Sequence, residues 1–88
     1  MQFDWDPDKE RINKRKHGIS FWDAVSVFDS SLTRHAADIE HGEPRIVATG
    51  PSTVGLLHVI YVERGHLIRI ISARKATRKE RKGYECSR

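Results

Sequence analysis

The chain has 88 residues, a single cysteine and a formal net charge of +4. This length suits one domain with one modest core, and a lone cysteine excludes a disulfide framework and a cysteine-based zinc site. The sequence also lacks an apolar run long enough to cross a membrane, and its first residues lack the basic and apolar regions of a signal peptide. We therefore expect a single domain over residues 1–88 in a reducing cytoplasm, with any chemistry at its surface.

The charges are segregated along the chain. Residues 9–17 hold five Lys/Arg against one acid, and residues 69–88 hold eight against two, whereas residues 18–68 hold three against six. Basic runs of this kind are either solvated helix faces or a site for a polyanion, of which nucleic acid is the common case. Charge alone leaves both interpretations open.

A first helix is predicted between Asp6-Pro7 and His17-Gly18. Asp6 can cap its start, with Pro7 in the first helical position, and Gly18 is a typical stop. Ile12 is its only large apolar residue. We therefore expect this helix to pack weakly and to show a basic face.

A second helix is predicted to begin after Ser20, which can cap it, with Asp23 in the acidic position of a capping box. Its apolar residues recur at i, i+3, i+4 and i+7, the spacing of a face that packs on a core. These residues are Phe21, Ala24, Val25 and Phe28. The stripe is more typical of a core than of a ligand site.

Strand patterns follow the second helix. They cover residues 32–37 weakly, 45–50 better, and 56–63 and 66–73 most strongly, with turns at GPSTVG and ERGH. If Arg64-Gly65 is a two-residue hairpin loop, Val62 faces Leu67, Ile60 faces Arg69 and His58 faces Ile71.

This register sorts the hairpin into two faces. His58 then lies diagonal to Arg69 on the face that also carries Ala73, while Leu57, Val59 and Tyr61 share the other face with Ser72. A slip of one residue would exchange these faces.

A last helix is predicted from Thr77 to about Cys86, because Thr77 and Glu80 form a T-x-x-E capping box. Arg74 and Lys75 then fall between the end of a central strand and a helix N-terminus, where free N–H groups and the helix dipole favour an anion. We expect a phosphate there. The fold class that follows is α+β, with two N-terminal helices, an antiparallel sheet of three to four strands and a C-terminal helix.

The residue types exclude several chemistries. The histidines lack zinc-ligand spacing beyond a bare His35/His41 pair, the acids lie mostly in turns and caps, and no glycine-rich nucleotide-binding loop is present. We therefore expect no metal and no cofactor. What remains is metal-free phosphodiester transfer, in which a base deprotonates a ribose 2′-OH, arginines stabilise the transition state and an acid protonates the leaving oxygen.

The candidate catalytic residues come from the strand pair. Arg69, Arg74 and Lys75 suit the stabilisation of a charged transition state, and His58 suits proton transfer. Two of these residues have a plainer alternative: an ion pair with Glu43 or Glu63 for Arg69, and a half-buried hydrogen-bonded sheet residue for His58.

Several motifs resemble the BrnT family of bacterial type II toxins. They are the runs NKRKHGISF from Asn13, ERG from Glu63 and IRIISARKATRKERKGYE from Ile68, with Ala24, Phe28, Glu43-x-Arg45 and Gly50. The similarity spans nearly the whole chain, and its most specific part is ISARKAT-x-x-E. The resemblance implies a RelE-like fold and an endoribonuclease that cleaves RNA and slows translation.

The resemblance also implies partners and site residues. It implies neutralisation by a BrnA-type antitoxin with a ribbon-helix-helix domain, and contact with operator DNA only through that antitoxin. It places cleavage at Arg74, with Arg64 and Arg69 as further candidates, whereas His58 is not part of the family motif.

Two further expectations concern the basic surfaces. RNA is expected to contact the basic helices through Lys16, Arg78, Lys79, Arg81 and Lys82, and an acidic antitoxin segment is expected to cover the Arg69–Lys75 face. The alternative function is a basic module that binds nucleic acid without cutting it.

Overall fold

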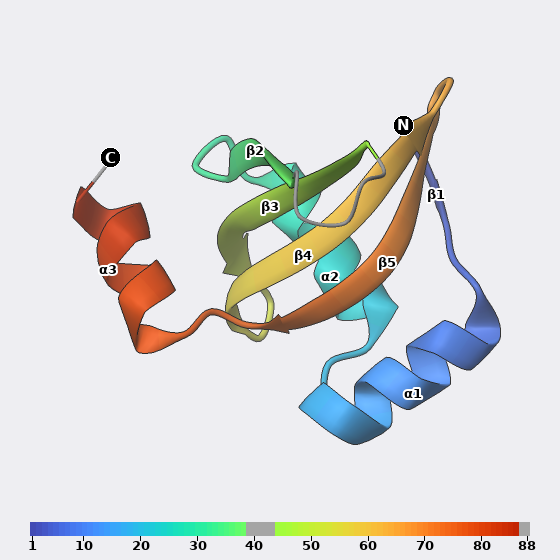
Figure 1. Cartoon of the computed structure of the whole chain (residues 1–88), viewed down its shortest axis with the longest axis horizontal. Helices are drawn as coiled ribbons and strands as arrows, with labels where there is room; N and C mark the ends of the chain where they lie inside the picture. Colours follow the sequence, from blue (N-terminus) through green and yellow to red (C-terminus); the bar gives the residue numbers. More distant parts are fainter. Residues whose placement is uncertain (39–43, 87–88) are drawn as a thin grey trace.

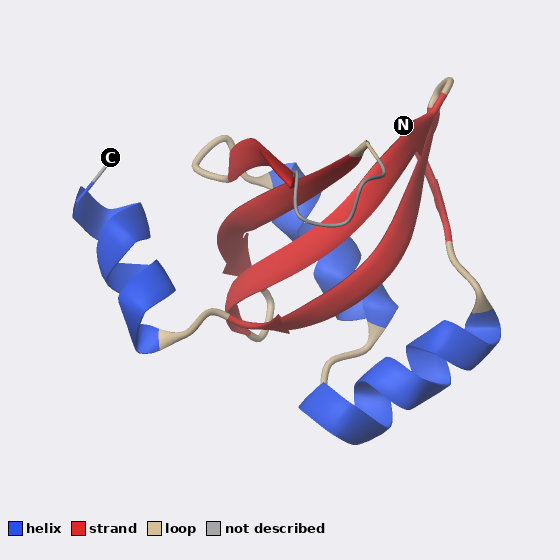
Figure 2. Cartoon of the chain, in the orientation of Figure 1, coloured by secondary structure: helices blue, strands red, loops and turns tan. Residues whose placement is uncertain are grey.

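The computed structural model describes residues 1–38 and 44–86 and has an α+β fold (Figures 1 and 2). The strands are β1 (Gln2–Asp4), β2 (Arg34–Asp38), β3 (Arg45–Ser52), β4 (Gly55–Arg64) and β5 (Leu67–Lys75). The helices are α1 (Pro7–His17), α2 (Phe21–Val25), the 3₁₀ helix η1 (Ser26–Asp29) and α3 (Arg78–Cys86). Within the described residues, no helix is long and apolar enough to span a bilayer.

The sheet has five strands in the order β1-β5-β4-β3-β2. The four predicted strands are all present, with ends within two residues of those expected. The prediction of three to four purely antiparallel strands is wrong, because β1 adds a fifth strand that runs parallel to β5. β1 has only three residues, which are too few to show the alternation of apolar and polar side chains that indicates a strand. Its position instead depends on distant contacts, such as the Phe3 ring 5.1 Å from that of Phe28.

The α1 helix has the predicted ends. The Asp6 carboxylate accepts a hydrogen bond from the Asp8 amide at 2.8 Å, and the N–H of Gly18, at φ 74°, donates to Lys14. Its attachment to the sheet was not predicted: Asn13 is buried and bonds both the N–H and the carbonyl of Ala73, at 3.1 and 2.8 Å. This polar contact holds α1 against the C-terminal half of β5.

The predicted second helix is an α-helix for about one turn and then continues as a 3₁₀ helix. The Ser20 hydroxyl caps α2 by accepting from the Asp23 amide at 3.1 Å. The Ser26 hydroxyl donates to the Asp23 carbonyl at 2.6 Å, and the chain continues as the 3₁₀ helix η1. Both segments lie across one face of the sheet (Figure 1). Phe21 and Val27 are fully buried there.

The β4–β5 hairpin turns one residue later than predicted. Its loop is Gly65-His66, and Gly65 adopts φ 63°, which suits the first position of a two-residue loop. As a result, Val62 pairs with Arg69 instead of Leu67.

A β-bulge then changes the pairing within the hairpin. Tyr61 pairs with Ile70 but Ile60 pairs with Ser72, so Ile71 is an extra residue on β5. Beyond the bulge, the buried face of β5 continues at Ala73, and Ser72 lies on the opposite face. The predicted faces of Ser72 and Ala73 were therefore wrong.

Candidate active site at the end of β5

The bulge places His58 directly opposite Arg74. The predicted diagonal position of His58 beside Arg69 was wrong for this reason. His58 and Arg74 share the face of the hairpin that α2 does not cover, because Leu57 and Ala73 take the buried positions next to them.

Arg74 is bound by Glu80 of α3. Its Nη1 and Nη2 atoms donate to the two carboxylate oxygens at 2.7 and 2.8 Å. Glu80 also accepts from the Thr77 amide at 2.8 Å, and the Glu80 amide donates to the Thr77 hydroxyl at 3.1 Å, which confirms the predicted capping box. The carboxylate thus lies between an arginine and a helix N-terminus, where a phosphate was expected.

Glu80 also contacts His58. The His58 Nδ1 atom lies 3.4 Å from a Glu80 carboxylate oxygen, and the His58 side chain is only 17% exposed. Within residues 1–38 and 44–86, this buried nitrogen has no hydrogen-bond partner. The Glu80 carboxylate therefore lies close to His58 Nδ1 without forming a hydrogen bond to it.

The electrostatics of the cluster follow from burial and pairing. Burial lowers the pKa of His58 below its ordinary value of 6.5, with Glu80 and Asp38 opposing and Arg74 reinforcing this shift. The hydrogen bond from Arg74 lowers the pKa of Glu80 to about 2, and the same bond raises the pKa of Arg74. Near neutral pH the cluster is therefore a neutral imidazole, a carboxylate and a guanidinium.

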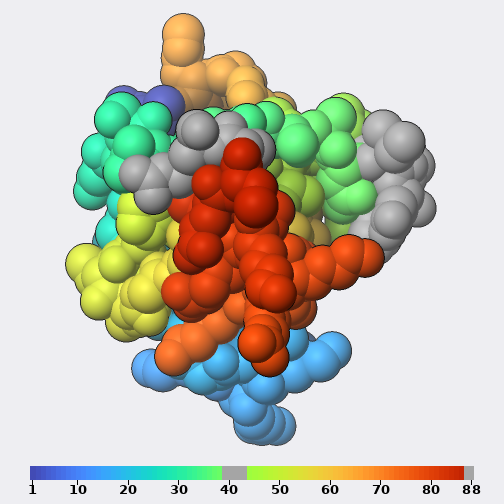
Figure 3. Space-filling view, turned by 90° about the vertical axis from the view of Figure 1, so that its left-hand side faces the viewer, coloured from blue at the N-terminus to red at the C-terminus, as the bar shows by residue number. Residues whose placement is uncertain are grey.

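A cleft of about 320 Å³ opens beside this cluster. His58 and Glu80 line it together with Thr49, Gly83 and Tyr84. Figure 3 looks onto this side of the molecule, with α3 in front and α1 below it. A substrate can therefore reach His58 between the sheet and α3.

The other predicted catalytic residues do not join the cluster. Within the described residues, Arg69 pairs with Asp4 of β1 at 3.0 Å and not with the predicted Glu63. Glu43, the other predicted partner, lies outside the described residues. Arg64 pairs with Leu67 at the hairpin loop, about 23 Å along the strand from Arg74. Lys75 follows Arg74 but points to the opposite face, because side chains alternate along a strand.

The basic residues predicted to bind RNA flank the same end of β5. Arg78, Lys79, Arg81 and Lys82 are exposed on α3. Lys16 is exposed on α1, one turn beyond the Asn13 that binds Ala73. Two basic helices are thus attached close to Arg74.

Sequence reasoning missed Glu80 as a member of the site. The T-x-x-E pattern identified it as a cap, which is correct, and its second contact depends on the turn between β5 and α3. One signal for this contact was present in the sequence. Glu80 follows Arg74 by six residues, so the two residues lie on either side of the turn that joins β5 to α3.

Comparison with known proteins identifies a family. A search of curated proteins gave no match. A family model described as the ribonuclease toxin BrnT of type II toxin-antitoxin systems matches residues 5–80, a range that includes His58, Arg74 and Glu80. Because this match covers most of the sequence, the chain belongs to the BrnT family of type II ribonuclease toxins.

Proposed function

We propose that this protein is a metal-independent endoribonuclease whose active site is formed by His58, Arg74 and Glu80. The observation that carries the proposal is the pairing of His58 with Arg74 across β4 and β5, with Glu80 in contact with both. A buried imidazole beside a guanidinium provides a base and a stabiliser of negative charge, which are the groups that RNA transesterification requires.

In the proposed reaction, neutral His58 removes the proton from a ribose 2′-OH. The 2′-oxygen attacks the adjacent phosphorus, and the bond from phosphorus to the 5′-oxygen breaks. Water protonates that departing oxygen, and the hydroxide that remains takes the proton from His58, which restores the neutral imidazole. The products are a 2′,3′-cyclic phosphate and a 5′-hydroxyl end. The low pKa of His58 keeps the imidazole in its basic form near neutral pH.

Arg74 stabilises the charge that develops on the phosphate oxygens. Within the described residues, its hydrogen bonds to Glu80 and to the Lys75 carbonyl use three of its five N–H groups, which leaves two for a phosphate. Glu80 acts through its neighbours, so it is a positioning residue that orients the guanidinium and lies against the imidazole.

The proposal is tested by incubating the purified protein with RNA in EDTA and identifying the new ends. Cyclic phosphate and 5′-hydroxyl ends are expected, and they should be lost in the His58→Ala variant. RNA binding without cleavage would instead support the alternative, a non-catalytic nucleic-acid-binding module. The exposed basic residues of α3 favour that alternative.

We further propose the cellular role that the family implies. RNA cleavage would inhibit translation, and a BrnA-type antitoxin with a ribbon-helix-helix domain would neutralise the toxin and alone contact operator DNA. A RelE-like fold also stays a prediction. The site supports neutralisation by an acidic segment, since Arg74 already binds one carboxylate, that of Glu80.

The partner proposal is tested by forming the complex with a BrnA-like antitoxin and adding RNA. We expect the antitoxin to exclude RNA and to protect Arg74 and Lys75 from hydrogen exchange. Simultaneous binding of RNA and antitoxin, with both residues unprotected, would show that inhibition acts from a distance.

A further inference from the structure

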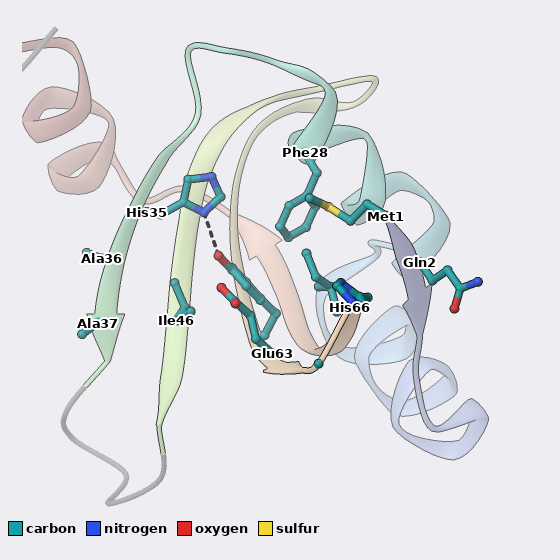
Figure 4. A pocket seen from close by; sticks show the side chains of 12 residues that line it. Met1, Gln2, Phe28, His35, Ala36, Ala37, Ile46, Glu63 and His66 are labelled. Atoms are coloured by element: carbon teal, nitrogen blue, oxygen red, sulfur yellow. Dashed lines mark hydrogen bonds between the residues drawn. The ribbon is translucent and has the colours of Figure 1, made fainter.

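The sheet extends well beyond the helices that cover its core face. α2 has five residues and η1 has four, so together they are about 15 Å long, whereas the ten residues of β4 span about 33 Å. Next to η1, the same face opens into a cleft of about 1170 Å³ (Figure 4). This second cleft lies on the opposite side of the sheet from His58, because Tyr61 and Glu63 alternate with the outward residues of β4.

Three aromatic rings that line this second cleft form a cluster. The ring centroids of Phe28 and Tyr61 are 5.0 Å apart, and His35 lies 5.9 Å from each. Ile46 and Ile68 add apolar surface. The rings meet edge to face or tilted, with interplanar angles of 79° for Phe28 and Tyr61, 89° for His35 and Tyr61, and 42° for Phe28 and His35. A planar heteroaromatic ring can stack on the exposed face of one of these rings, and such stacking does not depend on the base.

The polar side chains of the cleft belong to Gln2, His35, Tyr61, Glu63 and His66. His35 Nδ1 lies 2.8 Å from the Tyr61 hydroxyl. Burial and the charge of Glu63 raise the pKa of Tyr61, so the phenol stays protonated. If the Tyr61 hydroxyl donates to Nδ1 of His35, the proton of the neutral imidazole is on Nε2. If Nδ1 of His35 donates to the Tyr61 oxygen, the phenolic hydrogen does not take part in this hydrogen bond. Either tautomer leaves one donor for a ligand.

Glu63 supplies the matching acceptor. It is exposed at the rim, and Figure 4 shows it around the same cleft as His35, Phe28 and His66. A carboxylate with two oxygens accepts two parallel hydrogen bonds from a ligand that carries adjacent N–H groups. It also repels a phosphate, so the cleft is suited to the base of a nucleotide.

We propose that this cleft binds a guanine base. Guanine presents two adjacent donors, N1–H and the 2-amino group, which fit the Glu63 carboxylate, and the O6 acceptor, which fits the donor left by Tyr61 and His35. Adenine places a ring acceptor where guanine has N1–H, and that acceptor would face the carboxylate. The proposal does not depend on RNA cleavage, since the base can come from a free nucleotide or from single-stranded RNA.

The first experiment measures the affinity of the intact protein for GMP, IMP and AMP. IMP lacks the 2-amino group and therefore one hydrogen bond to Glu63, so we expect it to bind about 10-fold more weakly than GMP, with AMP weaker still. Equal affinities for GMP and AMP would overturn the proposal.

Variants then assign the binding to the cleft. Glu63→Gln should remove most of the preference for GMP over IMP. Glu85→Gln makes the same charge change at an exposed position of α3 and should leave the preference intact. Thermal unfolding of both variants checks that they are folded. Equal behaviour of the two variants would place nucleotide binding elsewhere.

A second arm distinguishes the source of the base. Short oligonucleotides with 2′-O-methyl groups have no 2′-OH to attack the phosphate, so their binding is independent of catalysis. Tighter binding of a guanosine oligomer than of its inosine counterpart identifies RNA, whereas binding of GMP alone identifies a free nucleotide. If cleft residues respond to an antitoxin and to no nucleotide, the cleft is a protein-docking groove and the proposal is wrong.

Discussion

The two arginines of β5 occupy very different surroundings. Arg69 forms one 3.0 Å contact with Asp4, which joins β5 to the short edge strand β1. Arg74 forms a bidentate contact with Glu80, beside the buried His58 and a cleft. Both are arginines in a predominantly apolar strand, so the residue type alone does not identify a catalytic position. The neighbouring residues distinguish the two positions. A lone carboxylate at a sheet edge indicates a structural ion pair, whereas a titratable group next to a cleft indicates a catalytic role.

The largest expected effect comes from removing His58. His58→Ala should reduce RNA cleavage by about 10²–10⁴, the usual contribution of a general base, and leave RNA affinity unchanged. His17→Ala, at an exposed position of α1, is the control. Cleavage of RNA by His58→Ala at the wild-type rate would remove His58 from the active site.

The dependence of the RNA-cleavage rate on pH also separates the His58 site from Arg69. His58 must be neutral to act as a base, and its pKa lies below 6.5, so the wild-type rate should rise with an inflection below pH 6.5 and stay level above it. Arg69→Ala should retain this profile. A level rate across this range, or an inflection well above pH 6.5, would contradict the role of His58.

Glu80→Gln should have an intermediate effect, mainly on stability. The folded pKa of about 2 lies below the ordinary 4.5, so the carboxylate stabilises the fold fully above pH 4.5 and loses this contribution as the pH falls towards 2. After allowance for solvent screening, we expect a loss of about 1–2 kcal/mol at pH 7.

Denaturant unfolding at several pH values measures this loss. The difference between wild type and Glu80→Gln should shrink between pH 4.5 and 2, and Glu85→Gln should show little difference at any pH. A constant difference down to pH 2 would mean that Glu80 contributes through its shape and not through its charge.

The smallest effect is expected from the surface of α3. Neutralising Arg78, Lys79, Arg81 and Lys82 together should weaken RNA binding and reduce the slope of log affinity against log salt by about 1–2, because these residues cover several faces and only some meet one RNA strand. The cleavage step itself should change little. An unchanged slope would assign these charges to solvent or to the antitoxin.

The parts of the fold that depend on local signals were predictable. The caps of α1, α2 and α3 and the extents of four strands follow from residues close in sequence. The bulge was not predictable, because Ile68, Ile70 and Ile71 are all apolar and conceal the change in alternation. Arg74 and His58 were both candidates from their chemistry, but their pairing required the bulge, and the role of Glu80 required the position of α3.

The most direct test of this division of roles compares Arg74→Ala with Arg69→Ala in one RNA-cleavage assay, in EDTA, at a temperature at which both variants are folded. Arg74→Ala should reduce the rate by about 10²–10³, the effect of losing one preorganised contact to the transition state, and Arg74→Lys should also be impaired because it lacks the bidentate fork. Arg69→Ala should cleave at nearly the wild-type rate and show only a modest loss of thermal stability. Wild-type cleavage by Arg74→Ala, or equal losses in both variants, would contradict the assignment of catalysis to the Arg74 end of β5.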